Sequence, residues 1–131
     1  MARVLIVDDD AEFLGMLREA LQTAGHDVVE ACNGDEALDQ FHSNVIDVII
    51  TDIVMPQRGG IETIVELRKE YPDLKVIAIS GAVVNGQSRM LDWAKRVGAS
   101  RTFMKPFEVK DLLMAVRALA AKPAQVSIDP I

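Results

Sequence analysis

Short runs of apolar residues alternate along this chain with longer stretches in which apolar residues recur every three or four positions. The short runs are typical of buried β-strands, and the longer stretches predict amphipathic helices. The predicted strands cover residues 4–7, 27–31, 45–51, 76–79 and 101–104. The predicted helices carry their apolar positions within residues 13–24, 37–41, 61–67, 90–97 and 109–119.

Five strand–helix units in succession predict an α/β fold, a doubly wound parallel sheet with helices on both faces. The run at 45–51 is apolar on both faces apart from Asp47, as a central parallel strand should be. A chain of 131 residues is long enough for one such domain. The pattern dissolves at its end, so we expect a domain over residues 1–121 and a flexible tail over residues 122–131.

Polar side chains stand where four of the predicted strands end. Asp8 and Asp9 follow the first strand, Asp52 the third, Ser80 the fourth and Lys105 the fifth. In open parallel sheets, sites form at the carboxyl ends of the strands, where the winding direction reverses. We therefore expect these five side chains to meet at one edge of the sheet.

Three carboxylates at one edge would repel one another. Two of them about 4 Å apart repel by roughly 4 kcal/mol at an effective dielectric near 20. Mg²⁺, which prefers oxygen ligands, would relieve this repulsion, and the Lys105 ammonium, with Asp52 as its expected first partner, would add positive charge. A carboxylate beside Mg²⁺ and an ammonium group can act as a nucleophile toward a phosphoryl group. The hydroxyl of Ser80 can then hydrogen-bond a phosphate oxygen.

Five short motifs lie at or beside these strand ends. They are Val-Asp-Asp-Asp at 7–10, Thr-Asp-Ile-Val-Met-Pro at 51–56, Gly60, Ile-Ser-Gly at 79–81 and Phe-Met-Lys-Pro-Phe at 103–107. In combination they resemble the receiver domains of two-component response regulators, over about residues 3–121. The resemblance implies five helices around a five-stranded parallel sheet of flavodoxin-like order 2-1-3-4-5.

The same resemblance implies a role for each site residue. Asp52 would be the phospho-acceptor and a ligand of Mg²⁺. Asp9 would bind the metal directly, Asp8 would act mostly through water, and the backbone carbonyl of Val54 would complete the protein's share of the coordination. Ser80 would be the switch hydroxyl that closes onto the phosphate.

Lys105 would contact the phosphoryl group, and the resemblance implies a cis Lys105-Pro106 bond. The sequence departs from the family at Thr102, where receivers usually carry Tyr or Phe that swings inward on activation. Phe103 is adjacent, but strand alternation directs it to the opposite face. The stretch from Ser80 to Lys105 is about three residues longer than the common pattern, and we expect the segment 81–88 to be the most mobile part of the fold.

The resemblance favours a phosphorylation switch. A histidine kinase or phosphotransfer protein would donate a phosphoryl group to Asp52, and the signal would pass to an unknown downstream protein target through the fourth helix, fifth strand and fifth helix. The only chemistry expected is the chain's own phosphorylation and dephosphorylation. One alternative is an aspartate-nucleophile phosphohydrolase, because Asp8-x-Asp10 after a strand resembles that superfamily's opening motif. Another, suggested by Thr102, is a receiver-like binding module that works without phosphorylation.

Composition narrows the class of partner. The net charge is −6 and no Lys/Arg run occurs, so direct nucleic-acid binding is not expected. No apolar run approaches the roughly 20 residues that span a bilayer, and no signal peptide is recognisable. The single cysteine, Cys32, excludes an internal disulfide. We expect a stand-alone cytoplasmic protein without membrane contact, a monomer or weak dimer, with Asp10 capping the first helix.

Overall fold

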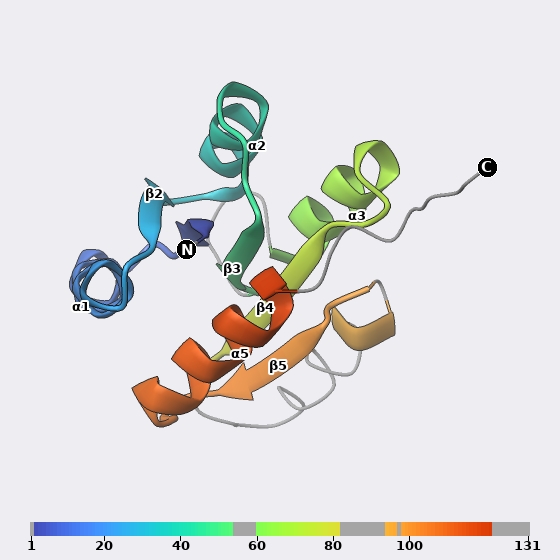
Figure 1. The fold of residues 1–131 in the computed structure, drawn as a ribbon. Helices are drawn as coiled ribbons and strands as arrows, with labels where there is room; N and C mark the ends of the chain where they lie inside the picture. Colours follow the sequence, from blue (N-terminus) through green and yellow to red (C-terminus); the bar gives the residue numbers. More distant parts are fainter. Residues whose placement is uncertain (1, 54–59, 82–93, 97, 122–131) are drawn as a thin grey trace.

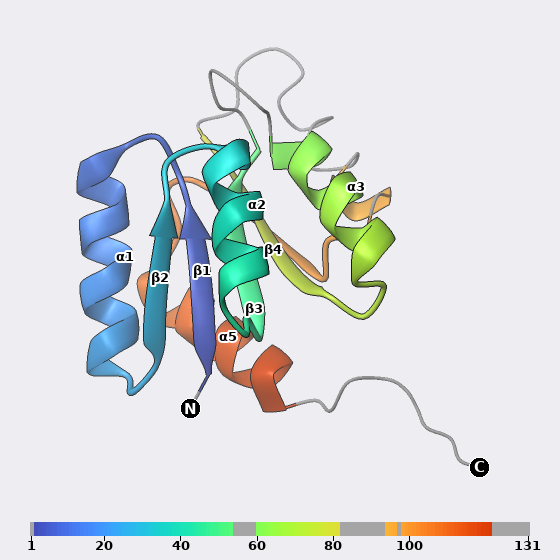
Figure 2. The ribbon, with the colours of Figure 1, turned by 90° about the horizontal axis from the view of Figure 1, so that it is seen from above.

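The computed structural model describes residues 2–53, 60–81, 94–96 and 98–121. Five parallel strands form one sheet in the order β2-β1-β3-β4-β5 (Figure 1). The strands are β1 Arg3–Val7, β2 Asp27–Ala31, β3 Val48–Asp52, β4 Lys75–Ser80 and β5 Arg101–Met104. Figure 2 shows β1 and β2 running side by side in the same direction. The predicted fold class and strand order are confirmed.

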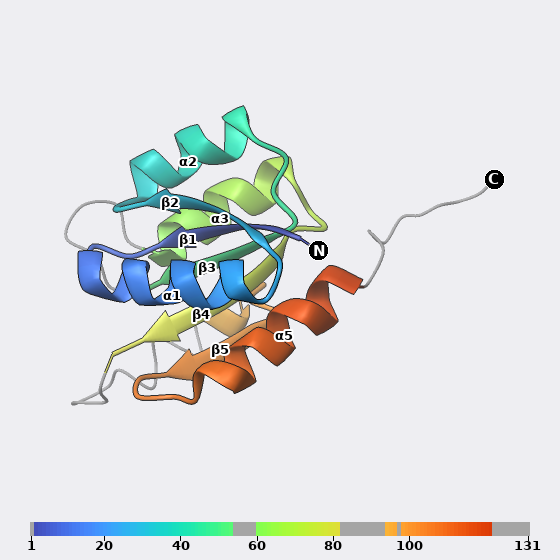
Figure 3. The same cartoon turned by 60° about the vertical axis from the view of Figure 1, so that its left-hand side comes forward.

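The helices divide between the two faces of this sheet (Figure 3). Helices α1 and α5 pack on one face, and α2 and α3 pack on the other. Their bounds are α1 Ala11–Thr23, α2 Gly34–Ser43, α3 Gly60–Glu70 and α5 Val109–Ala121. Residues 94–96 are helical, as the sequence predicts, while residues 90–93 and 97 of that predicted helix lie outside the described residues. Within the described residues, no helix combines the length and apolar character needed to cross a membrane.

Strand β1 shows how the alternation of side chains builds two cores. Val4 and Ile6 pack against the α1/α5 layer, whereas Leu5 and Val7 pack against the α2/α3 layer. All four side chains are at most 2% exposed. Both faces of the strand are therefore buried, which explains why its sequence is a continuous apolar run. Full burial of each such side chain contributes about 1.5–3 kcal/mol.

Strand β3 begins later than its apolar run suggests. The prediction placed its start at Val45, but the strand begins at Val48, and Val45 is 77% exposed. The carboxylate of Asp47 accepts a hydrogen bond from the backbone N–H of Arg3 at 2.8 Å, just before the strand starts. The run is therefore a connecting segment followed by a strand, and only its second half lies in the sheet.

Local capping fixes where the first two helices begin. Asp10 accepts hydrogen bonds from the backbone N–H groups of Glu12 and Phe13, at 3.0 and 3.3 Å, and caps α1 as predicted. Asn33 accepts one from the N–H of Glu36 at 2.9 Å and caps α2. The side chain of Asp10 is thus committed to α1, which leaves the preceding acids for the sheet edge.

Candidate functional site

Three carboxylates converge at the carboxyl ends of β1 and β3, two of the interior strands. Val7 pairs with Thr51 in the parallel register, so the next residues, Asp8 and Asp52, lie side by side at the end of their strands. Asp9 completes the group, and one carboxylate oxygen from each of the three lies within 4.8 Å of the others. Asp8 and Asp52 are buried, whereas Asp9 is exposed. The structure thereby brings together the three acids that the sequence singled out.

Burial gives this group unfavourable electrostatics. Desolvation raises the pKa of Asp8 above its ordinary value of 3.8, and the nearby charge of Asp9 adds to the rise. The backbone N–H of Asp10, which donates to Oδ1 of Asp8 at 2.9 Å, and the ammonium of Lys105 both act in the opposite direction. Hard carboxylate oxygens from separate strands, held close together, fit a small divalent cation such as Mg²⁺.

The ammonium of Lys105 enters the site, but its first partner differs from the prediction. Nζ lies 3.2 Å from Oδ2 of Asp8, which it hydrogen-bonds, and 3.8 Å from Oδ2 of Asp52. The prediction that Asp52 would be the first partner is therefore wrong. Lys105 reaches the site across the ring of Phe13, whose centroid is 3.9 Å from Nζ. Phe13 belongs to α1, the helix that begins just after Asp8. Contact with its ring therefore places the ammonium of Lys105 closer to Asp8 than to Asp52.

Ser80 contributes a buried hydroxyl at the end of β4. The residue is 0% exposed, and within the described part of the chain its Oγ has no hydrogen-bond partner. A buried polar group left unpaired costs about 1–3 kcal/mol. Ile79 pairs with Asp52 across the β3–β4 ladder, which brings the following residue, Ser80, to the same edge as the acids. Such a hydroxyl fits a site that receives an oxygen-rich ligand.

The backbone around Lys105 ties β5 to this edge. The N–H of Lys105 donates to the carbonyl of Ser80 at 2.8 Å, and the Lys105-Pro106 peptide bond is cis, as the resemblance implied. Thr102 pairs with Ala78 and Phe103 with Ile79. Phe103 packs against the α1/α5 core, as strand alternation predicted.

Two sequence predictions lie outside the described residues, and one neighbour of the site was missed. The carbonyl of Val54 and nearly all of the segment 81–88 fall among residues that the structure does not describe. The missed neighbour is Phe13. Its only sequence signal was an apolar position in the first turn of a helix, which packing alone would explain.

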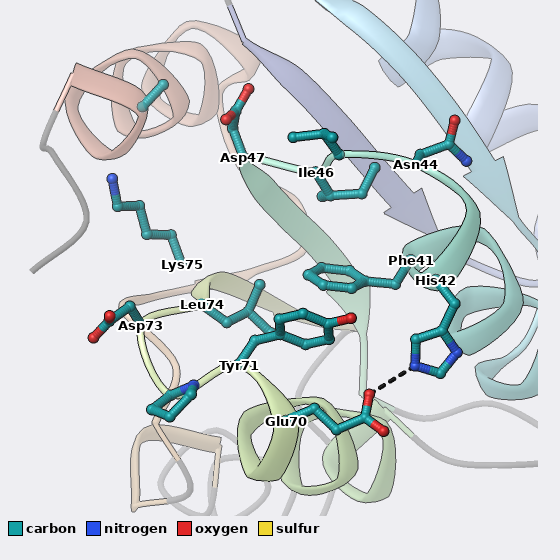
Figure 4. A pocket seen from close by; sticks show the side chains of 13 residues that line it. Phe41, His42, Asn44, Ile46, Asp47, Glu70, Tyr71, Asp73, Leu74 and Lys75 are labelled. Atoms are coloured by element: carbon teal, nitrogen blue, oxygen red, sulfur yellow. Dashed lines mark hydrogen bonds and ion pairs between the residues drawn. The ribbon is translucent and has the colours of Figure 1, made fainter. Parts of the chain in front are cut away.

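A hollow lies at the opposite end of the sheet from these acids. Its volume is about 720 Å³, and Phe41, Tyr71 and Leu74 are among the residues that line it (Figure 4). His42 Nε2 lies 2.7 Å from Oε1 of Glu70 at its rim. Its lining includes Asp47, just before β3, and Lys75, the first residue of β4. None of the five site residues lines it. This hollow is therefore separate from the acidic site.

Comparison with known proteins identifies relatives of this arrangement. The family model described as response regulator receiver domain matches residues 4–117. The chemotaxis protein CheY of Thermotoga maritima is 36% identical over 119 residues, which cover 90% of this chain and 97% of that protein. The transcriptional regulatory protein CpxR of Escherichia coli is 34% identical over 119 residues, which cover 91% of this chain and 49% of CpxR.

A solved structure shows the same fold. The crystal structure of the response regulator protein TrrA of Thermotoga maritima, in complex with Mg²⁺–BeF, superposes with a TM-score of 0.78 at 36% sequence identity. The alignment covers 91% of this chain and 99% of TrrA.

Proposed function

This chain belongs to the response regulator receiver domain family, and we propose that Asp52 is the side chain that carries its phosphoryl group. Receiver domains are signalling domains of two-component systems, so the function is phosphorylation-dependent signalling. The donor class that follows from this membership is a histidine kinase or a phosphotransfer protein. The assignment of Asp52 depends on its position between the buried carboxyl of Asp8 and the buried hydroxyl of Ser80. The ammonium of Lys105 lies 3.8 Å from its Oδ2.

Asp52 is better suited than its neighbours to be the nucleophile. Asp8 is fixed by hydrogen bonds from the backbone of Asp10 and from Lys105. Asp9 is exposed. Asp52 lies between these groups on the interior strand β3, within reach of the lysine and beside the strand that ends in Ser80. In the proposed step, a carboxylate oxygen of Asp52 bonds to phosphorus while the bond from phosphorus to the donor's leaving group breaks.

The other side chains stabilise the charge on the transferred group. The ammonium of Lys105 moves from Asp8 toward the new phosphoryl oxygens, which carry more negative charge than the carboxylate did. The hydroxyl of Ser80 donates to one of these oxygens and gains the partner that it lacks among the described residues. This new hydrogen bond stabilises the conformation that the β4 end adopts in the phosphorylated state. It thereby shifts the equilibrium between two conformations of the domain toward that state.

Mg²⁺ is part of the proposal. Asp8, Asp9 and Asp52 would hold it, and when bound it would neutralise phosphoryl oxygens and relieve the repulsion among the carboxylates. The family match and the acidic group support this choice of metal. The Mg²⁺ in the related TrrA structure supports it as well. In this proposal Asp9 binds the metal directly, Asp52 is a further ligand, and Asp8 acts mainly through water.

The signalling unit is proposed as a receiver domain over residues 1–121 in the cytoplasm, acting as a monomer or weak dimer. Its downstream partner would be a protein that distinguishes the phosphorylated form. The chain matches nearly all of CheY but about half of CpxR, so receivers of this kind occur both alone and as parts of longer proteins.

Acetyl phosphate with Mg²⁺ tests the assignment. We expect intact-mass spectrometry to show one added phosphoryl group on the wild-type chain and none on Asp52→Asn. The control is Asp47→Asn, which removes the carboxylate just before the start of β3, far from the site, and keeps an oxygen that can accept from Arg3. Adduct formation on Asp52→Asn equal to that of wild type would refute the role of Asp52. A separate incubation with a general phosphatase substrate tests the phosphohydrolase alternative, which multiple turnovers of that substrate per chain would favour over the switch.

A further inference from the structure

We propose that Phe13 is a positioning residue, whose ring holds the ammonium of Lys105 at the mouth of the phosphorylation site. This inference rests on the proposed function of Lys105 and adds a residue that the site motifs do not contain. The centroid of the Phe13 ring is 3.9 Å from Nζ of Lys105, inside the range of about 6 Å in which a cation is attracted to a ring face.

Lys105 needs such a holder because its other contacts do not define one position. Its ammonium lies 3.2 Å from Asp8 and 3.8 Å from Asp52, two carboxylates of the same charge on neighbouring strands. The side chain is 26% exposed, so part of it borders solvent. A lysine on a flexible four-carbon stem loses considerable rotamer freedom when it is fixed, and a ring that covers one side of the ammonium limits its alternatives.

Phe13 is itself held in place from both ends. Its backbone N–H donates to the capping carboxylate of Asp10 at 3.3 Å, which fixes the first turn of α1. Its ring meets the ring of Phe107 edge to face, with centroids 6.2 Å apart and planes at 88°. Phe107 follows the Lys105-Pro106 bond, so the contact joins α1 to the segment that carries the lysine. Edge-to-face geometry is a favoured arrangement for aromatic pairs.

The ring supplies a kind of interaction that an aliphatic side chain does not. The negative face of an aromatic ring attracts the ammonium without forming a hydrogen bond, so the N–H donors stay available for oxygen acceptors. When the phosphoryl group arrives, Lys105 can turn toward it from a position already at the site. Replacing the ring by leucine keeps apolar volume but removes this attraction.

Three variants of the full chain separate the roles. Phe13→Leu removes the ring, and Phe13→Tyr keeps it. Phe103→Leu removes an aromatic of the same core, whose ring centroid lies 5.5 Å from that of Phe107. We expect Phe13→Leu to slow the initial rate of phosphorylation by acetyl phosphate with Mg²⁺ about fivefold, which corresponds to about 1 kcal/mol. The other two variants should remain within about twofold of wild type.

A second readout needs neither donor nor metal. In wild type, the ring current of Phe13 should shift the Lys105 Hε protons upfield in the NMR spectrum. The shift should vanish in Phe13→Leu and persist in Phe13→Tyr and Phe103→Leu. Unchanged Lys105 shifts in Phe13→Leu, or a Phe13→Tyr variant as slow as Phe13→Leu, would overturn the inference. Phosphorylation of Asp52→Asn would instead refute the proposed function, while the NMR comparison would still decide the position of Lys105.

Discussion

Neutralising Asp8 should make the unphosphorylated, metal-free protein more stable at pH 7. Asp8→Asn keeps an oxygen that can accept from the N–H of Asp10, and it removes a charge that burial disfavours. The variant also loses the attraction between Asp8 and Lys105, whose ammonium still has Asp52 at 3.8 Å. The sign of the net effect depends on which of these contributions is larger.

Coulomb's law at an effective dielectric near 20 gives the scale. At the 4.8 Å limit, each carboxylate pair that includes Asp8 repels by roughly 3.5 kcal/mol, while the 3.2 Å contact with Lys105 attracts by about 5 kcal/mol. Neutralising Asp8 therefore removes two repulsions, with Asp9 and with Asp52, and one attraction, with Lys105. Solvent screens the exposed Asp9, so we expect a gain of about 1–2 kcal/mol in the free energy of unfolding.

The dependence on pH tests the cause of this gain. The folded pKa of Asp8 lies above its ordinary value of 3.8, so the folded state favours the protonated carboxyl. The stability that protonation contributes is fully present below pH 3.8 and is lost as the pH rises through the folded pKa. The advantage of Asp8→Asn should accordingly be largest near pH 7 and shrink toward pH 3.8.

Urea unfolding at several pH values, with EDTA present, measures this difference. A variant that is less stable than wild type at pH 7 would refute the reasoning, because the ammonium contact would then outweigh repulsion and desolvation together. Adding Mg²⁺ should narrow the gap, since a ligand that binds only the folded state stabilises it and the variant has lost one carboxylate of the site. Asp10→Asn, which retains a capping side chain, is the matched control.

Three further predictions concern single side chains. Ser80→Ala should raise the free energy of unfolding of the unphosphorylated protein by about 1 kcal/mol, because it removes a buried hydroxyl that has no partner among the described residues; a loss of stability in urea would contradict this. The same variant should abolish the chemical-shift changes at the β4 end on phosphorylation. Lys105→Met should lower the free energy of unfolding at pH 7 by about 1–2 kcal/mol in urea titration, because Asp8 loses the ammonium beside it. The same variant should slow adduct formation at least tenfold, as followed by mass spectrometry. Gly98→Ala should cost about 1–2 kcal/mol in thermal unfolding, because residue 98 has φ +112° and its added methyl would meet the side chain of Arg68.

The sequence predicted best the features that depend on neighbouring residues. The limits of β2 and β5 agree with the predicted ranges 27–31 and 101–104, because each strand is bounded by local breaks in the pattern. Asp10 could be recognised as a cap because capping involves only the next turn of the helix. The grouping of Asp8 and Asp52 followed from parallel topology, which leaves little choice once the strands are assigned.

What the sequence could not predict depends on packing between distant segments. The start of β3 was placed too early because an apolar residue such as Val45 looks the same whether it is buried or exposed. The preference of Lys105 for Asp8 results from its path across Phe13, which joins residues far apart in the chain. The role of Phe13 was missed for the same reason, since an apolar helix position carries no sign of the cation that it faces.

Anchoring the reactive carboxylates on the interior strands has an evolutionary consequence. Asp8 and Asp52 extend from β1 and β3, which have neighbours on both edges and helices on both faces. The outer faces of the helices take no part in holding these acids. Mutations there can change which proteins recognise the domain while the chemistry stays intact, so lineages can acquire new signalling circuits without having to reinvent the phosphorylation reaction.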